Sequence, residues 1–191
     1  MATSEQGKIA KQGGEAWNQW RSEHSDVVPD LTEVQLHRVE LKGADMSGAV
    51  LVETLLTKAE FDGANFDNAN MKQVNLWGAS LVKASLKGAN LQEANLRSTK
   101  LHDANLEGAD LTGSELNFGD LTGANLKAVN LSGALCVHVD LTGVDLSGAN
   151  LKDLLNWADI KSIKDAKVDG VINPPDGFLE WAKENGAVTS S

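Results

Sequence analysis

The sequence contains little of what disulfide-stabilised, secreted or membrane-spanning proteins require. Its single cysteine, Cys136, permits no internal disulfide, and its place in the pattern described below predicts a small buried side chain. Residues 1–8 contain no apolar run, so we expect no secretory signal, and no segment is long and apolar enough to cross a bilayer. These absences predict a cytoplasmic protein that does not contact a membrane.

The residues that carry common catalytic chemistry are also few and scattered. None of the four histidines pairs with another histidine, a cysteine or an acid at a spacing typical of metal ligands. The sequence has no phosphate-binding loop, nucleophile elbow or paired-cysteine motif. We therefore expect a protein that is not an enzyme and that holds neither a cofactor nor a metal.

What the sequence has in abundance is a five-residue repeat. From Leu31 to Leu151, every fifth residue is Leu, Met, Phe or Cys, which gives 25 consecutive positions without an insertion. The residue two places before each of these central residues is almost always small or β-branched, and the residue between them is Asn or Asp fifteen times. Two places after the central residue, Gly occurs eleven times. Such a fixed period is the sequence signature of a repeat architecture.

A period of five fits neither an α-helix nor an alternating strand. In an extended segment, the central residue and the small residue two places before it point to the same side, whereas the residue between them points away. The two following residues are polar or Gly, which favours a corner, because Gly accepts the positive φ of many turns. A chain that turns after every quintet must coil. The pattern therefore predicts an all-β solenoid in which each coil packs on its neighbours.

The quintets, as at residues 64–66 and 89–91, resemble those of the pentapeptide-repeat family. This resemblance implies a right-handed quadrilateral parallel β-helix with four quintets per coil, one on each wall. We expect the β-helix over residues 29–153, an N-terminal helical cap over residues 1–28, and a C-terminal cap with a short helix over residues 154–191. The coils would begin at residues 29, 49, 69, 89, 109 and 129, with a seventh starting at 149. At about 4.8 Å per coil, the rod would be roughly 30 Å long.

Both ends of such a column need a cover, because unpaired backbone and an exposed apolar core favour edge-to-edge aggregation. Residues 5–24 carry apolar side chains at helical spacing, which predicts one amphipathic helix with Trp17 and Trp20 against the first coil. Residues 16–21 also resemble the N-terminal cap of bacterial, including cyanobacterial, members of the family. Residues 177–184 are predicted to form a short helix, with Phe178 and Trp181 facing the last coil.

Function in a narrow packed rod must lie on its outside, and one predicted wall differs from the other three. This apolar wall consists of the outward residues of the quintets that start at residues 34, 54, 74, 94, 114 and 134. It combines apolar and basic side chains, which is typical of a protein interface. A helix folded back over the wall, contact with a partner or second copy, and chance are three open explanations. The candidate interface residues are Leu55, Trp77, Phe118, Leu135, Val137, Arg38, Lys58 and Arg97.

The sequence therefore favours a non-catalytic scaffold or regulatory protein that binds another protein through the apolar wall, and a homodimer is one form of this contact. The alternative comes from the resemblance, because some family members mimic B-form DNA and inhibit or protect DNA gyrase, a type II topoisomerase. The repeat region carries 17 acids and 10 bases, which is less than half the charge density of a duplex with one charge per about 1.7 Å. Its acidic surface predicts no direct binding of nucleic acid.

Overall fold

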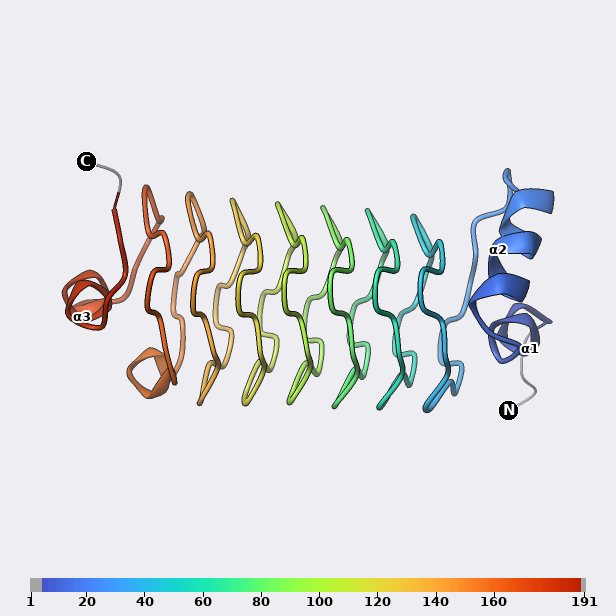
Figure 1. Cartoon of the computed structure of the whole chain (residues 1–191), viewed down its shortest axis with the longest axis horizontal. Helices are drawn as coiled ribbons and strands as arrows, with labels where there is room; N and C mark the ends of the chain where they lie inside the picture. The colour runs from blue at the N-terminus through green and yellow to red at the C-terminus, as the bar shows by residue number, and fades with distance from the viewer. Residues whose placement is uncertain (1–4, 190–191) are drawn as a thin grey trace.

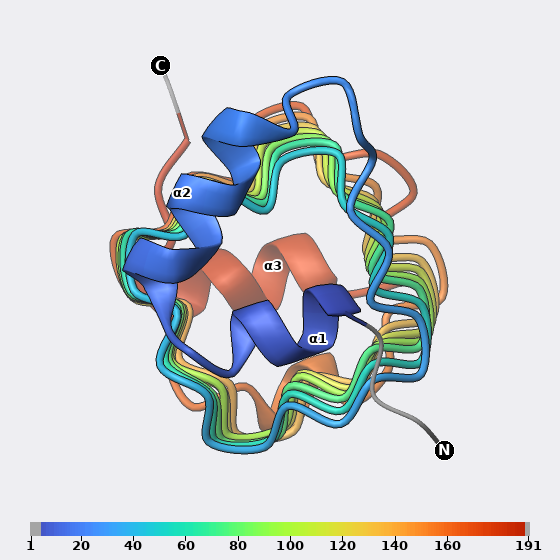
Figure 2. The ribbon, with the colours of Figure 1, turned by 90° about the vertical axis from the view of Figure 1, so that its right-hand side faces the viewer.

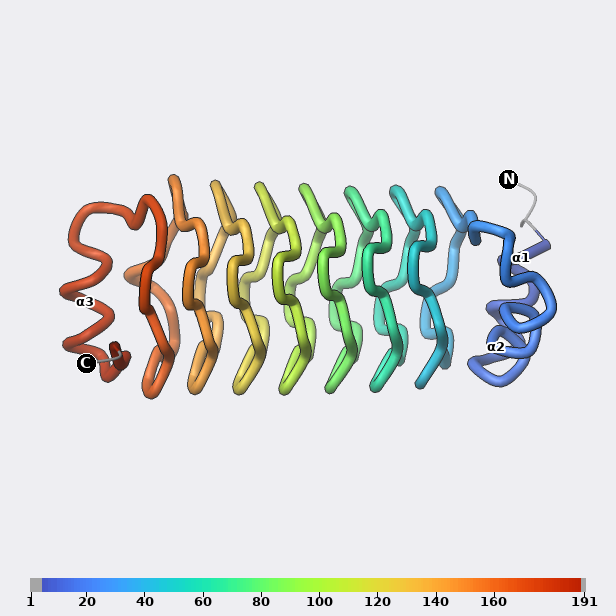
Figure 3. Tube along the Cα trace, turned by 90° about the horizontal axis from the view of Figure 1, so that it is seen from above, coloured from blue at the N-terminus to red at the C-terminus, as the bar shows by residue number. Residues whose placement is uncertain are grey.

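A computed structural model describes residues 5–189 of the chain. It shows a rod of stacked coils with helices at both ends (Figure 1). Helices α1 (Glu5–Ala10) and α2 (Gly14–Glu23) lie at one end, and α3 (Phe178–Glu184) lies at the other. Seen along the rod, the coils superpose around a common axis (Figure 2), and the view from above shows the same regular stacking (Figure 3).

Backbone pairing between the coils is parallel and links residues 20 apart. It starts with the bridge between Asp30 and Val50 and continues every five residues to the bridge between Leu135 and Leu155. Because corners follow one another so closely, the pairing consists of isolated bridges rather than long strands. A pairing step of 20 contains four quintets. This confirms the coiling predicted from the period, together with the parallel pairing and the four quintets per coil that the family resemblance implies.

The coils extend beyond Asp153, where the repeat pattern of the sequence ends. Three further bridges link residues 22 apart, and the last of them joins Asn150 to Ile172. The step grows by two in the part of the coil where a short 3-10 helix, η1 (Trp157–Asp159), replaces the regular corner. An irregular seventh coil thus continues the stack.

The predicted inside and outside of the quintet are confirmed. Every central residue from Leu31 to Leu151 is buried, and so is every residue two places before a central one. Cys136 belongs to this buried column. The residues between them and the two residues of each corner are partly or fully exposed. The core is therefore a continuous column of large and small side chains along the axis of the rod.

The corners share one backbone geometry. The second residue after the central residue has a positive φ at every corner, and eleven of these residues are Gly. In the first corner, the N–H of Val34 donates a hydrogen bond to the carbonyl of Leu31 (3.0 Å). Asp30 Oδ1, one place before the central residue, accepts a hydrogen bond from the N–H of Thr32 (2.9 Å). Turn chemistry therefore explains why Asn, Asp and Gly recur in the repeat.

Two corner substitutions should separate backbone strain from packing. A Cβ on Gly108 (φ 67°) would meet nothing within 4 Å. Its replacement by alanine should therefore lower the free energy of unfolding by about 1 kcal/mol through the positive φ alone. Ala128 has a φ of 52°, and its replacement by glycine should raise the free energy of unfolding by about 0.5–1 kcal/mol. Urea denaturation measures both changes, and two changes of the same sign would contradict this account of the corners.

The N-terminal cap consists of two short helices, so the prediction of a single helix is wrong. The helical segment is interrupted at Gly13, whose φ is 104°, and a Cβ on Gly14 would lie 2.7 Å from the carbonyl oxygen of Lys42. Glycine is needed at this point because α2 begins against the backbone of the first coil. Trp17 is fully buried and donates a hydrogen bond from Nε1 to the carbonyl of Asp45 (2.8 Å). This side chain closes the first coil, as predicted.

The C-terminal helix α3 covers the last coil. Phe178 is buried, and the Trp157 ring of η1 packs against Phe178 and Trp181, with centroids 5.9 and 5.6 Å apart. After the helix, the N–H of Val188 donates a hydrogen bond to the carbonyl of Ala166 (2.8 Å). The chain thus pairs with part of the edge that the stack would otherwise leave open.

Candidate functional site

The part of the chain that the structure describes has few arrangements suited to chemistry. Among residues 5–189, no group of three or more His, Cys, Asp or Glu side chains is placed to hold a metal ion. Within the same range, no helix has the length and apolar character needed to cross a membrane. Burial raises the pKa of the Cys136 thiol to about 12, which disfavours the reactive thiolate.

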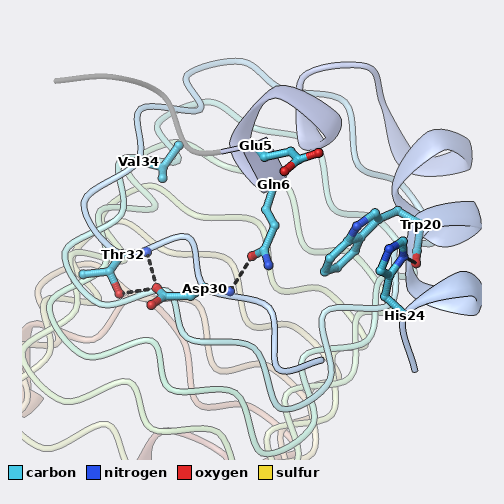
Figure 4. A pocket seen from close by; sticks show the side chains of 7 residues that line it. All are labelled: Glu5, Gln6, Trp20, His24, Asp30, Thr32 and Val34. Carbon is cyan, nitrogen blue, oxygen red and sulfur yellow. Dashed lines mark hydrogen bonds between the residues drawn. The ribbon is translucent and has the colours of Figure 1, made fainter. Parts of the chain in front are cut away.

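A cleft of about 520 Å³ lies where the N-terminal helices meet the first coil (Figure 4). Gln6 Oε1 accepts a hydrogen bond from the N–H of Asp30 (2.6 Å), and Asp30 Oδ1 accepts one from the hydroxyl of Thr32 (2.6 Å). The side-chain and backbone hydrogen bonds from Thr32 hold the pKa of the Asp30 carboxyl below its usual value. On the α2 side of the cleft, Trp20 stacks on His24 with 5.1 Å between ring centroids. The hydrogen bond between Gln6 and Asp30 joins the cap to the rod, and the cleft lies at this junction.

The apolar wall is a continuous surface along the rod. On this wall, the residue before each central position is paired by a parallel bridge with its equivalent on the next coil. This column of bridges runs from Gln35 on the first coil to Leu155 on the seventh. Helices α1 and α2 lie across one end of the rod and α3 across the other, as two perpendicular views show (Figures 1 and 3). For residues 5–189, the explanation of the wall by a folded-back terminal helix is therefore wrong.

The candidate residues on this wall differ in exposure. Trp77 is 42% exposed and Phe118 is 54% exposed, which is high for aromatic side chains. Leu55, Leu135 and Val137 are half-buried. The three basic candidates are all exposed: Arg38, Lys58 and Arg97.

A first cluster lies on the first three coils. The Lys58 ammonium lies 4.9 Å from the centroid of the Trp77 ring, within the range of a cation–π interaction. The N–H of Lys58 also bonds to the carbonyl of Trp77 (2.9 Å), and the N–H of Arg38 bonds to the carbonyl of Thr57 (3.0 Å). Arg38, Leu55, Lys58 and Trp77 thus lie on adjacent coils, and we call them the basic cluster.

A second cluster lies on the fifth to seventh coils. The N–H of Phe118 donates to the carbonyl of Val137 (2.9 Å), and Leu135 is bridged to Leu155 on the next coil. The ring centroids of Phe118 and His138 are 5.4 Å apart. We call these five residues the apolar cluster. The eight predicted residues therefore share one wall but do not form one patch.

Sequence reasoning missed two members of the apolar cluster. Leu155 is 47% exposed and lies beyond Asp153, where the repeat pattern was expected to end. Its position exactly one coil after Leu135 is the signal that would have found it. His138 was counted as an isolated histidine, because its neighbour Phe118 lies a whole coil earlier in the sequence.

On the apolar wall, the single base of the fourth coil and the single acid of the fifth coil balance each other. Arg97 lies 3.8 Å from Glu115 in an ion pair, so this base is already neutralised within the wall. Over residues 29–153, the outward positions of the apolar wall carry three bases and one acid, whereas each of the other three walls carries more acids than bases. The net positive charge of the apolar wall therefore comes from the basic cluster.

The apolar wall also departs from the local preferences of the repeat. Phe118 occupies a corner with a φ of 61°, a conformation that costs a residue with a Cβ roughly 1–2 kcal/mol. Leu55, Leu135 and Leu155 stand where Asn or Asp most often closes the turn. Departures from local preference are expected at functional sites. The turn chemistry of the repeat does not account for these side chains.

Comparison with known proteins identifies the repeat. The family model for pentapeptide repeats matches in eight copies, over residues 35–73, 69–108, 89–127 and 120–153, which together cover more than half of the chain. No curated protein matches the chain.

Several solved structures are similar to the rod. QnrB1, a plasmid-mediated fluoroquinolone resistance protein, matches with a TM-score of 0.73 at 15% identity, over 82% of this chain and 77% of its own. Rfr23, from the cyanobacterium Cyanothece 51142, matches with a TM-score of 0.37 at 22% identity, over 91% of this chain and 97% of its own. A protein from the Arabidopsis thaliana thylakoid lumen matches with a TM-score of 0.40 at 30% identity, over 53% of this chain and 63% of its own. At so low an identity, the similarity to QnrB1 concerns the fold alone. With the repeat model matched over most of the rod, this chain belongs to the pentapeptide-repeat family.

Proposed function

We propose that this protein is a non-catalytic scaffold or regulatory protein of the cytoplasm that binds another protein through the apolar wall. The right-handed, four-walled form of its β-helix, which the family resemblance implies, is part of this proposal. The observation that carries it is the exposure of Trp77 and Phe118 on one wall, at 42% and 54%, with no helix of the described residues over them. Exposed apolar side chains gathered on one surface mark contact sites.

The rod suits this role because its wall is rigid before contact. Each coil is hydrogen-bonded to the coils before and after it, so the backbone needs little ordering when a partner binds. Preorganisation of this kind reduces the entropic cost of association. An aromatic anchor on such a surface is typical of the residues that dominate binding energy.

Replacement of Trp77 by glutamate should abolish binding through the wall. We expect the Trp77→Glu variant to lose capture of protein partners from an extract of the native cell, and to lose any self-association seen by sedimentation. Its melting temperature should stay unchanged, because the Trp77 side chain is exposed. Val82→Glu is the matched control, since Val82 occupies the same quintet position on the same coil but on the neighbouring wall.

Retention of both partner capture and oligomeric state in Trp77→Glu would remove the apolar wall from consideration. Equal losses in Trp77→Glu and Val82→Glu would indicate a general effect of the introduced charge.

A second candidate function is modulation of DNA gyrase by imitation of the charge of DNA. The excess of acids on three walls favours it. However, several of these acids are paired with lysines: Lys161 Nζ lies 2.9 Å from Asp140 Oδ2, and Lys127 Nζ lies 3.4 Å from Asp145 Oδ2. Supercoiling assays with purified gyrase test this candidate directly. If increasing concentrations of the protein neither inhibited nor protected gyrase, this candidate function would be excluded.

A further inference from the structure

The two clusters of the apolar wall differ in chemistry, which points to the chemistry of the partner. We infer that the partner presents one amphipathic segment that lies lengthwise along the wall. Its acidic stretch lies over the basic cluster on the first to third coils, and its apolar stretch lies over the apolar cluster on the fifth to seventh coils. This inference rests on the proposed protein-binding role of the wall and adds the composition and direction of what binds.

The basic cluster provides two cations with no acidic partner of their own. Arg38 and Lys58 are exposed at corners of adjacent coils, and among residues 5–189 neither forms an ion pair. The Lys58 ammonium instead lies over the Trp77 ring. In a chain of net charge −10, this local excess of positive charge favours carboxylates over bases in the partner. Hydrogen bonds between such cations and carboxylates are among the stronger ones in proteins.

The apolar cluster offers a surface without a free cation. Phe118 and Leu155 are 54% and 47% exposed, and Leu135 and Val137 lie half-buried beside them. Its one titratable member, His138, packs against the Phe118 ring. The Arg97–Glu115 ion pair on the fourth and fifth coils adds no net charge between the clusters. From the first coil to the seventh, the wall thus changes from basic to apolar.

The spacing of the clusters sets the length of the segment. Arg38 lies on the first coil and Leu155 on the seventh, and six steps of about 4.8 Å separate them by roughly 29 Å. An α-helix of about 20 residues covers that distance at about 1.5 Å per residue. One helical face of this length can reach both clusters at once.

A second copy of this chain fits the wall less well. Over residues 29–153, each of its other walls carries more acids than bases and no outward Leu, Phe or Trp that could pair with Phe118 and Leu155. Two apolar walls packed side by side in the same direction would bring the unpaired bases Arg38 and Lys58 of both copies together. In opposite directions, they would place these bases over the apolar cluster of the other copy. Charge complementarity therefore favours an acidic segment of another protein.

Labelled synthetic helices test this inference with the full-length chain. The first probe is an alanine-based peptide of about 20 residues with glutamates on one face of one half and leucine and phenylalanine on the same face of the other half. The second probe carries lysine in place of glutamate, and the third carries serine in place of the apolar residues. Fluorescence anisotropy should show the first peptide binding at least about tenfold more tightly than either of the others. Added salt should weaken its binding.

Charge reversal in the protein provides the matched test. Lys58→Glu should weaken binding of the glutamate peptide at least about tenfold and improve binding of the lysine peptide. Lys83→Glu is the control, because Lys83 occupies the same corner position with a positive φ on a different wall. It should leave both affinities unchanged. Circular dichroism and melting of both variants should match the unmodified protein.

Equal binding of the glutamate and lysine peptides, no binding of the glutamate peptide, or an unchanged affinity in Lys58→Glu would each overturn the inference. Partner capture that is lost in Trp77→Glu but retained in Lys58→Glu would overturn it while leaving the proposed function in place. A dimer in sedimentation that dissociates in Trp77→Glu would overturn it by identifying a second copy as the occupant.

Discussion

Replacement of Leu106 by alanine is expected to lower the free energy of unfolding by about 2–5 kcal/mol. Leu106 is a central residue in the middle of the rod, and its side chain is fully buried between Leu86 and Leu126 of the adjacent coils, which are buried as well. The coils above and below are held by backbone hydrogen bonds, as between the N–H of Leu106 and the carbonyl of Asn125 (2.8 Å). They cannot close onto the space that the missing methyl groups leave, so the cavity should persist.

Leu55→Ala is the matched control for this measurement. It removes the same atoms from a half-buried outward position and should lower the free energy of unfolding by less than about 1 kcal/mol. Denaturant unfolding of both variants under the same conditions gives the comparison. Equal losses at the two positions would show that the quintet does not separate core from surface as described.

Removal of residues 174–191 is expected to convert the protein from a soluble species into one that associates through its end. The deletion removes α3, so the loss of the buried Phe178 leaves Trp157 exposed, and the pairing of Val188 with Ala166 is lost. The last coil would then present unpaired N–H and C=O groups beside an open apolar column. Such an edge is a template for pairing with another chain. Size-exclusion chromatography and light scattering should show oligomers or precipitate.

A shorter deletion provides the control for this experiment. A chain that ends at Thr189 keeps α3 and the pairing of Val188, and it should behave as the full chain does. If the chain truncated after Asn173 stayed soluble, monomeric and unchanged in melting temperature, α3 would contribute neither to the stability of the rod nor to its protection from association.

The architecture could be predicted because every quintet repeats the same two inward positions and the same corner. The alternation of a large and a small inward residue identifies the buried side, and every predicted inward position from Pro29 to Leu151 is buried. The positive φ at every corner agrees with the frequency of Gly, although fourteen of the corners carry other residues. Few folds repeat one local rule so many times, which is why the sequence identified the core. The assignment of outward residues to four walls came from the family resemblance.

The parts that could not be predicted are those where the repeat stops. The separation of α1 from α2 depends on a close approach between Gly14 and the carbonyl of Lys42, a contact between distant parts of the chain. The pairing step of 22 depends on the shape of η1 and not on periodicity. The candidate wall was found in outline, but its division into two clusters required the pairing of residues such as Leu135 and Leu155 across coils.

The relation between a quintet and a coil gives length changes in this rod an unusual effect. Deletion of one quintet from the middle would leave every large side chain facing the axis, yet it would rotate all later residues by a quarter of the circumference. Phe118 and Val137 would then stand on a different side of the molecule from Trp77. Deletion of a whole coil would instead shorten the rod and keep each surface column aligned. Members of this architecture can therefore vary in length by whole coils without rearranging their surfaces, whereas a change of one quintet creates a new surface on an unchanged core.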